Sequence, residues 1–165
     1  MSYLNNIQNF PSYVKRMIFF FTLSMTVGYF TGFNFIYRTT ELKPQGIEEN
    51  YNGNEEDENA EVMLFKKPEN EILTTIHTHI LSFSLIFIAL CGVLLAVPMP
   101  QKLKSFLLIE PFVSTILTFG GIWFLWKGFI WVKYIVMLSG ILLTLSFVLI
   151  VFFVFKSLLI SPKQV

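Results

Sequence analysis

The sequence predicts an all-α membrane protein, a four-helix transmembrane bundle with one long acidic extracytoplasmic loop. The chain has 165 residues, of which 54% are hydrophobic and only 14% are charged, which is far more apolar than a soluble domain. Four largely apolar segments each match or exceed the ~20 residues that cross a bilayer. They form one membrane domain over residues 1–165 and lie at about 17–36, 68–97, 106–126 and 131–155, with the acidic loop at 37–67.

The charge balance and the cysteine count exclude several classes of function. Lysine and arginine total 12, aspartate and glutamate total 11, and no basic block is present, so we expect membrane lipid as the surroundings and no nucleic-acid partner. Cys91 is the only cysteine, so the chain has neither a disulfide framework nor the pair that thiol–disulfide exchange requires. We expect a buried, inert thiol.

The first segment, 17–36, is expected to be an uncleaved membrane helix, because a basic pair precedes it and no Ala-x-Ala cleavage pattern follows it. Ser24, Gly28 and Gly32 recur every four residues and place small side chains on one helix face, which allows a neighbouring backbone to approach closely. We expect this face to be a packing seam. Its partner could be another helix of this chain, which we favour, or a second subunit.

Ten of the eleven carboxylates lie between Glu41 and Glu71, mostly in the polar segment 37–67. That segment contains Pro-x-Gly and Asn-Gly sequences, which are typical of turns. We expect a partly ordered loop over the helix ends. The acidic run at 55–58 could hold a divalent cation, but it lacks the residue spacing of a calcium loop, so a solvated loop is the favoured interpretation.

The second predicted helix, 68–97, begins in water, with Pro68 and carboxylates suited to its first turn. Its length of ~45 Å, at ~1.5 Å per residue, exceeds the hydrocarbon core of a bilayer. Both histidines of the protein, His77 and His79, are therefore expected near the outer boundary of the lipid core. An ionisable group in that position is a candidate for function.

The orientation depends on how lysine and arginine are divided between the two sides of the membrane. Six lie on each side of the predicted bundle, so the count alone is a tie. The basic pair before the first helix and the short loops on that side predict both termini in the cytoplasm. The expected location is the bacterial inner (plasma) membrane, as a multi-pass protein.

The spacing of the histidines restricts the cofactors that they could bind. Residues two apart on a helix point about 200° apart, so His77 and His79 cannot chelate one metal ion from a regular helix. A haem held by histidines on opposite helices is excluded within one chain, because both belong to the same helix. A histidine could still pair with Met137 of the fourth helix or, less well placed in depth, with Met25 of the first.

Several polar groups of other helices are expected in the same outer half of the membrane as the histidines. They could satisfy one another as interhelical hydrogen bonds, or they could form a site for a metal or haem, or for a quinone, a lipid or protons. The cofactor therefore stays unknown at this point, with a metal ion or haem as the specific candidates.

Glu110 is the only carboxylate outside the acidic region and lies six residues past Lys104 in the third predicted helix. It is expected toward the cytoplasmic face, away from the histidines. The favoured interpretation is that it reaches the interface or pairs with Lys104. The alternative is that it handles protons within the membrane.

Short blocks of residues are spaced over most of the chain, at 28–32, 39–51 with Gly53 and Glu55, 65–67, 71–73, 138–140 and 145–147, together with the His-x-His pair at 77–79. They resemble a family of small, uncharacterised bacterial four-helix integral membrane proteins with a His-x-His pair at the start of the second helix. The resemblance implies the four-helix topology and a site around the paired histidines. It implies no particular activity.

The leading functional hypothesis is non-enzymatic: a small accessory or assembly subunit of an envelope or respiratory complex. Such a subunit could bind a metal or haem through His77 or His79, and it would have a protein partner or form a homo-oligomer. The alternative is a membrane oxidoreductase or a quinone-binding electron-transfer protein. A transporter ranks third, because the four helices show no inverted repeat.

Overall fold

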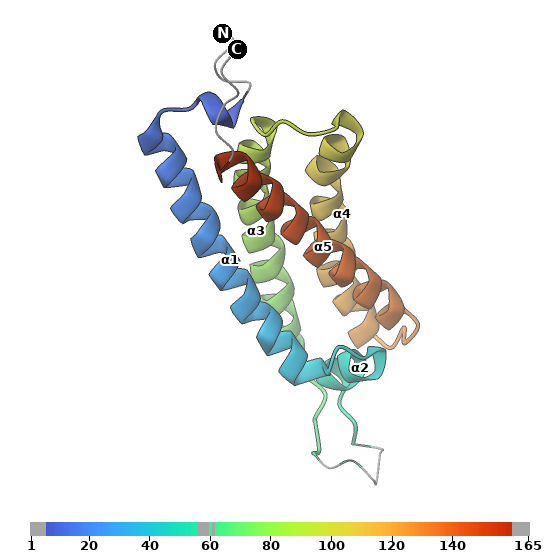
Figure 1. Ribbon diagram of the computed structural model, residues 1–165. Coiled ribbons are helices and arrows are strands. Elements are labelled where there is room, and N and C mark those ends of the chain that lie inside the picture. The colour runs from blue at the N-terminus through green and yellow to red at the C-terminus, as the bar shows by residue number, and fades with distance from the viewer. Residues whose placement is uncertain (1–5, 56–59, 61, 160–165) are drawn as a thin grey trace.

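The computed structural model describes residues 6–55, 60 and 62–159, and over these residues it contains helices and no strand (Figure 1). The four long helices are long and apolar enough to cross a membrane. The predicted all-α fold with four candidate membrane spans is therefore confirmed. A short 3-10 helix, η2 (Ile7–Asn9), precedes α1 (Ser12–Thr40), α2 (Pro44–Asn52), α3 (Glu69–Leu95), α4 (Gln101–Trp126) and α5 (Val132–Leu159).

Three of the long helices form the body of the bundle, and α1 lies at its edge (Figure 1). α4 packs extensively against both α3 and α5, whereas α1 touches its neighbours sparsely. The beginning of α1 and the end of α5 lie at the same end of the bundle, and the short helix α2 lies across the opposite end. α1 is therefore the span that exposes most of its surface.

Three of the long helices extend beyond the predicted apolar segments at one or both ends, whereas α3 lies within the predicted 68–97. α1 runs from Ser12 to Thr40 instead of over 17–36, and α4 begins at Gln101 instead of 106. Hydropathy marks the residues that suit lipid, whereas the backbone hydrogen bonds of a helix continue through polar residues outside the hydrocarbon.

The prediction of a loop over the whole of 37–67 is wrong. Glu41 and Leu42 adopt positive φ angles of 51° and 55° and turn the chain at the end of α1. Pro44 then begins the nine-residue helix α2, where its fixed φ suits a first turn, and the buried Ile47 anchors the helix. The acidic run lies at 55–58 of the sequence, and its residues 56–58 lie outside the described residues. The two chain termini, which we predict in the cytoplasm, also lie outside them.

The junctions of α5 with α4 and α1 show how closely the helices pack. A Cβ placed on Gly121 of α4 would lie 2.8 Å from Cγ2 of Val136, so only glycine permits this approach of α4 to α5. Farther along α5, the ring of Tyr29 from α1 stacks on Phe147 with centroids 3.8 Å apart. The Tyr29 hydroxyl also lies 3.1 Å from Oγ1 of Thr144. Tyr29 thus joins α1 to α5 through both its ring and its hydroxyl, and Phe19 of α1 makes a second aromatic contact with Phe155 of α5.

Candidate functional site

The end of α2 and the residues just before α3 contact the end of the bundle where α4 stops. The side-chain amide of Asn52 donates to the carbonyl of Leu125 at 2.9 Å, and Nζ of Lys66 donates to the carbonyl of Trp126 at 2.9 Å. These carbonyls belong to the last turn of α4, where no residue four positions later can reach them. The lysine also complements the negative end of the helix dipole. We call the described residues of the segment 44–67 the cap.

Ion pairs and burial hold the cap in place. Nζ of Lys133 on α5 lies 2.7 Å from Oε2 of Glu48 on α2, in a partly buried pair. Tyr51 of α2 packs against the core, and this burial raises the pKa of Tyr51 to about 12. A phenol with a raised pKa stays neutral over the whole physiological range, as its apolar surroundings require.

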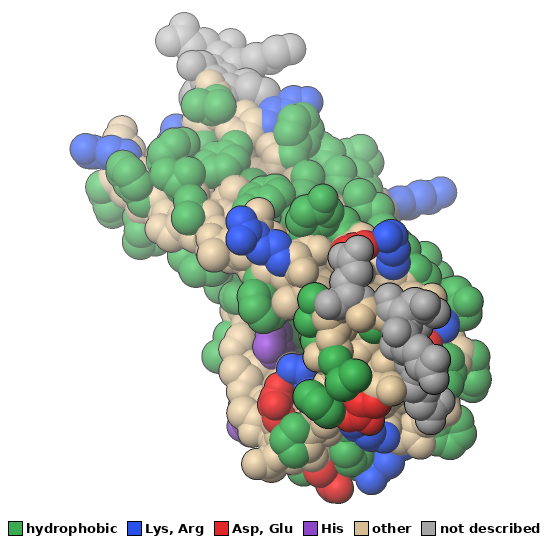
Figure 2. All heavy atoms as spheres, turned by 90° about the horizontal axis from the view of Figure 1, so that it is seen from below, with side chains coloured by type: hydrophobic (Ala, Val, Ile, Leu, Met, Phe, Trp, Pro, Cys, Tyr) green, Lys and Arg blue, Asp and Glu red, His purple; other side chains and the backbone are tan. Residues whose placement is uncertain are grey.

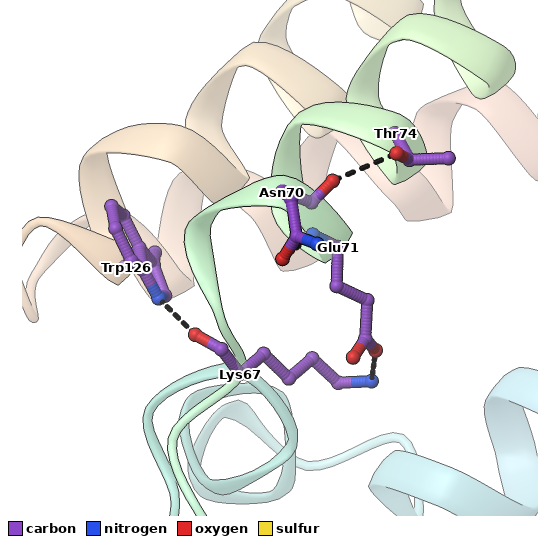
Figure 3. Close-up of polar contacts among 5 residues, drawn as sticks. All are labelled: Lys67, Asn70, Glu71, Thr74 and Trp126. Carbon is purple, nitrogen blue, oxygen red and sulfur yellow. Dashed lines mark hydrogen bonds and ion pairs between the residues drawn. The ribbon is translucent and has the colours of Figure 1, made fainter.

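The start of α3 is tied to the end of α4 (Figure 3). Nε1 of Trp126 donates to the carbonyl of Lys67 at 2.8 Å. The ammonium of Lys67 pairs with Glu71 one turn later, and Oγ1 of Thr74 donates to the carbonyl of Asn70 at 2.7 Å. These contacts fix the first two turns of α3, from which the histidine-containing turns continue.

His79 lies against α4, although it is exposed. Its ring stacks on Phe119 with centroids 4.8 Å apart and an interplanar angle of 28°. Nδ1 lies 2.7 Å from the carbonyl of Thr75, and since a carbonyl only accepts, Nδ1 carries the proton and donates. In the neutral ring, Nε2 is then the nitrogen with the free lone pair.

His77 and Met137, the other predicted ligands, lie in different surroundings. His77 is exposed on α3, whereas Met137 on α5 is half-buried against the core. Over the part of the chain that the structure describes, no three side chains of His, Cys, Asp or Glu come close enough to hold one metal ion. Binding of a metal or haem by His77, His79 and Met137 therefore stays a prediction.

Charged side chains gather around the cap. Figure 2 views the bundle from this end: acidic and basic groups lie on and beside the cap, hydrophobic side chains cover the helices that run away from it, and histidine is visible at the surface. The cap thus forms the polar end of an otherwise apolar molecule.

The seam of Ser24, Gly28 and Gly32 faces away from the bundle. All three residues are exposed, and a Cβ added at Gly28 or at Gly32 would have no atom within 4 Å. Our preference for a packing partner within this chain is therefore wrong for the described residues. The alternative of a second subunit stays open.

Further small and polar residues continue this surface of α1. Thr31, Asn34 and Arg38 are exposed, and they follow Ser24 and Gly28 at spacings of three or four, which keeps them on one side of the helix. Nε of Arg38 donates to Oδ1 of Asn34 at 3.0 Å. A shallow open groove beside them is lined by α1 residues alone. We call Ser24, Gly28, Thr31, Gly32, Asn34 and Arg38 the outer face of α1.

Glu110 is buried in the body of the bundle, at 8% exposure. The hydroxyls of Ser114 and Ser146 donate to its two carboxylate oxygens. The favoured pairing with Lys104 is wrong, because Nζ of Lys104 instead donates to the carbonyl of Leu95 at 3.1 Å. Ser114, one turn after Glu110, could have been found from spacing alone, but Ser146 belongs to another helix and no sequence signal links the two.

Comparison with known proteins gives one match. The family model of a transmembrane helical domain, Aq_1264_TM, matches residues 41–165, which include α2, α3, α4 and α5. No curated protein and no solved structure matches the chain.

Proposed function

This chain belongs to the Aq_1264_TM family of transmembrane helical domains, and from its membrane-embedded helical architecture we propose that it is a small accessory or assembly subunit of a membrane complex. In this proposal it attaches to a transmembrane helix of its partner through the outer face of α1. The complex would be an envelope or respiratory complex of the bacterial inner membrane, with both termini of this chain in the cytoplasm.

The observation that supports the proposal is the direction of the outer face. Gly28 and Gly32 have open space around them, and α1 is the least buried of the four spans. Lipid tails gain nothing from small residues on a helix, whereas a second helix can approach its backbone closely at such positions. A partner helix would therefore fill the space that this chain leaves open.

The polar members of the outer face favour a protein neighbour over lipid. Oγ1 of Thr31 donates to the carbonyl of Val27 at 2.9 Å, so its hydroxyl is satisfied without a partner. Among the described residues, the amide group of Asn34 bonds Arg38 through its oxygen, and its N–H groups have no partner. Hydrogen bonds between membrane helices contribute about 0.6 kcal/mol each on average, so Asn34 would add to the packing at the glycines.

The test is a pair of leucine substitutions with a matched control. Gly28→Leu and Gly32→Leu add bulk on the outer face, and Gly92→Leu adds the same bulk on α3, where a Cβ also has no atom within 4 Å. All three leave the isolated chain intact. Affinity purification of a tagged chain from native membranes should show roughly tenfold less partner for the α1 variants, equivalent to about 1.4 kcal/mol, and an unchanged amount for Gly92→Leu.

Two results would overturn the proposal. One is equal recovery of the partner with all three variants. The other is the absence of any stable partner of the unaltered chain in native membranes, tested by crosslinking before solubilisation.

A second candidate function is metal or haem binding by His79, with His77 or Met137 as a further ligand. The specific observation in its favour is the Nδ1–H bond of His79 to the carbonyl of Thr75, because ligating histidines usually donate their other ring N–H to such an acceptor. Nε2 would then be the ligating atom. Additional ligands would have to come from the partner subunit.

A further inference from the structure

Glu110 occupies an unusual place for a carboxylate. It lies in the candidate membrane span α4, and its partner Ser146 lies close to the midpoint of the candidate span α5 (Val132–Leu159). Only 8% of it is exposed. Ionisable groups at such depths are rare, because an unpaired charge loses its hydration there.

The partners of Glu110 are hydroxyl groups. Ser114 binds one carboxylate oxygen from the next turn of α4, and Ser146 binds the other oxygen from α5. Both serines are buried, with 2% of each exposed. The three side chains therefore form a closed polar cluster that joins α4 to α5.

A backbone carbonyl next to this cluster also finds its hydrogen-bond donor within the bundle. Pro111 has no N–H, so the carbonyl of Leu107 lacks the helical hydrogen bond that a residue at 111 would normally give it. The thiol of Cys91 on α3 lies 3.6 Å from this carbonyl and donates to it. This gives the lone cysteine a structural role, and it leaves no free carbonyl beside Glu110 at this position.

Among the described residues, no cationic side chain forms an ion pair with Glu110. The charged residues of α3 lie in its first eleven positions, those of α4 other than Glu110 lie in its first turn, and Lys133 and Lys156 lie at the two ends of α5. The titratable side chains that face this region are Cys91 of α3 and Tyr29 of α1, which stacks on the neighbour of Ser146.

A hydroxyl differs from a lysine or arginine as a partner for a carboxyl group. Lysine and arginine only donate, so they satisfy the carboxylate alone, whereas a serine hydroxyl both donates and accepts. Ser114 and Ser146 can therefore donate to a carboxylate, and either can rotate to accept from a carboxylic acid. The same cluster stays hydrogen-bonded in both protonation states.

We propose that Glu110, Ser114 and Ser146 form a reversible proton-binding site in the middle of the bundle. Glu110 binds the proton, and the serines are positioning residues that keep both of its forms satisfied. This site is separate from the outer face of α1 and does not depend on the accessory-subunit proposal. Because the site joins α4 to α5, a change in the packing of these helices, or a partner that exchanges protons there, would alter proton binding by Glu110.

Infrared spectroscopy of the chain in lipid nanodiscs tests the proposal directly. A protonated carboxyl group in apolar surroundings gives a C=O stretching band that is distinct from the bands of a carboxylate. The expected result is such a band at low pH, its decrease as the pH rises, and its loss in Glu110→Gln. In Ser146→Ala the band should shift, because one hydrogen bond to the carboxyl group is removed.

A substitution at Glu110 could prevent folding. The infrared band is therefore also assigned by isotope labelling of the unaltered chain. Labelling with ¹³C-glutamate shifts the band if it belongs to a glutamic acid, and hydrogen–deuterium exchange shifts it if the group is protonated. The other ten carboxylates lie between Glu41 and Glu71 in the sequence, and none of those that the structure describes is buried. Absence of a label-sensitive acid band at every pH at which the helices remain folded would overturn the proposal.

Chemical modification distinguishes a proton from a metal cation at the same oxygens. A hydrophobic carbodiimide adds to a neutral carboxylic acid in a membrane, and mass spectrometry locates the adduct. The expected result is an adduct on Glu110 that forms more slowly as the pH rises and at the same rate with or without sodium ions. Protection by sodium at constant pH would assign the site to a cation and overturn the proposal.

Discussion

Nζ of Lys66 lies 2.9 Å from the carbonyl of Trp126 and 5.0 Å from the centre of its indole ring. One side chain of the cap therefore both completes the last turn of α4 and makes a cation–π contact with its final residue. The relationship joins residues sixty positions apart. It ties the described residues next to α3 to the end of the bundle.

Replacing Lys66 should loosen the cap and leave the spans intact. Lys66→Met keeps the aliphatic stem but removes the charge that meets the end of α4, with an expected loss of about 1 kcal/mol because the side chain is exposed. Limited proteolysis between α2 and α3 should become faster. Lys43→Met is the control, since Lys43 pairs only with the neighbouring Glu41 at the surface. Equal proteolysis of the two variants would contradict the role of Lys66.

The corner between α1 and α2 should tolerate no side chain at Gly46. A Cβ there would lie 2.1 Å from the backbone oxygen of Thr40, which cannot move without displacing the end of α1. Gly46→Ala should therefore destabilise the corner by about 2 kcal/mol or more. Thermal unfolding in detergent should show a lower midpoint, whereas Gly92→Ala, which meets no atom within 4 Å, should leave the midpoint unchanged. A midpoint for Gly46→Ala equal to that of Gly92→Ala would show that the corner is not tightly packed.

Alkaline pH should favour the release of α2 from the end of the bundle, which we call undocking, because Tyr51 then loses its proton. The ordinary pKa of tyrosine is 10.0, and burial raises the pKa of Tyr51 to about 12 in the docked state. Below pH 10 the phenol is neutral in both states and adds no pH dependence. Between about pH 10 and 12 the undocked phenol loses its proton while the docked one keeps it, so rising pH favours undocking.

Phenolate absorbance and proteolysis of the cap measure this effect together. The unaltered chain should show late-titrating phenolate absorbance and faster proteolysis of the cap above pH 10, and Tyr51→Phe should reduce the late absorbance and lose the faster proteolysis. Tyr37→Phe, at an exposed position, is the control. An unchanged alkaline response in Tyr51→Phe would assign the effect to another group.

Metal or haem binding through the histidines is tested by measuring the metal content and the optical spectrum of the purified chain. The chain purified in mild detergent should contain a stoichiometric metal or show a haem Soret band if His79 is a ligand. His79→Ala should lose it, and treatment with a chelator should remove a bound metal from the unaltered chain. His77→Ala then tells whether the second histidine takes part. A metal-free and haem-free protein that keeps its fold in both variants would remove these residues from the list of ligands.

Packing of α1 on α5 should depend on both the aromatic ring and the hydroxyl group of Tyr29. Tyr29→Phe keeps the stacking on Phe147 but removes the hydrogen bond to Thr144, with an expected loss of about 1 kcal/mol. Tyr29→Ala also removes the stacking and should release α1 from the bundle, measured as faster crosslinking of α1 to lipid-soluble probes. If both variants react at the same rate, the aromatic contact does not hold α1.

Sequence by itself determined the four spans of this protein. A bilayer requires about 20 apolar residues of each helix, and hydropathy is a local property that any stretch of the chain displays. It also located the single isolated carboxylate, Glu110, and the histidines near the start of the second long helix. Helix ends were less well predicted, because helical hydrogen bonding continues beyond the residues that suit lipid.

Only the tertiary structure decided which way these helices face. Rotation of α1 turned Ser24, Gly28 and Gly32 outward, and packing of α5 on α4 brought Ser146 to Glu110 in place of the expected Lys104. Docking of the cap on α4 depended on Asn52 and Lys66 meeting carbonyls far along the chain. Each long helix carries apolar residues on all of its sides, so the apolar pattern does not specify how the helix is rotated about its axis. The partners of a polar group depend on that rotation and on the contacts between helices.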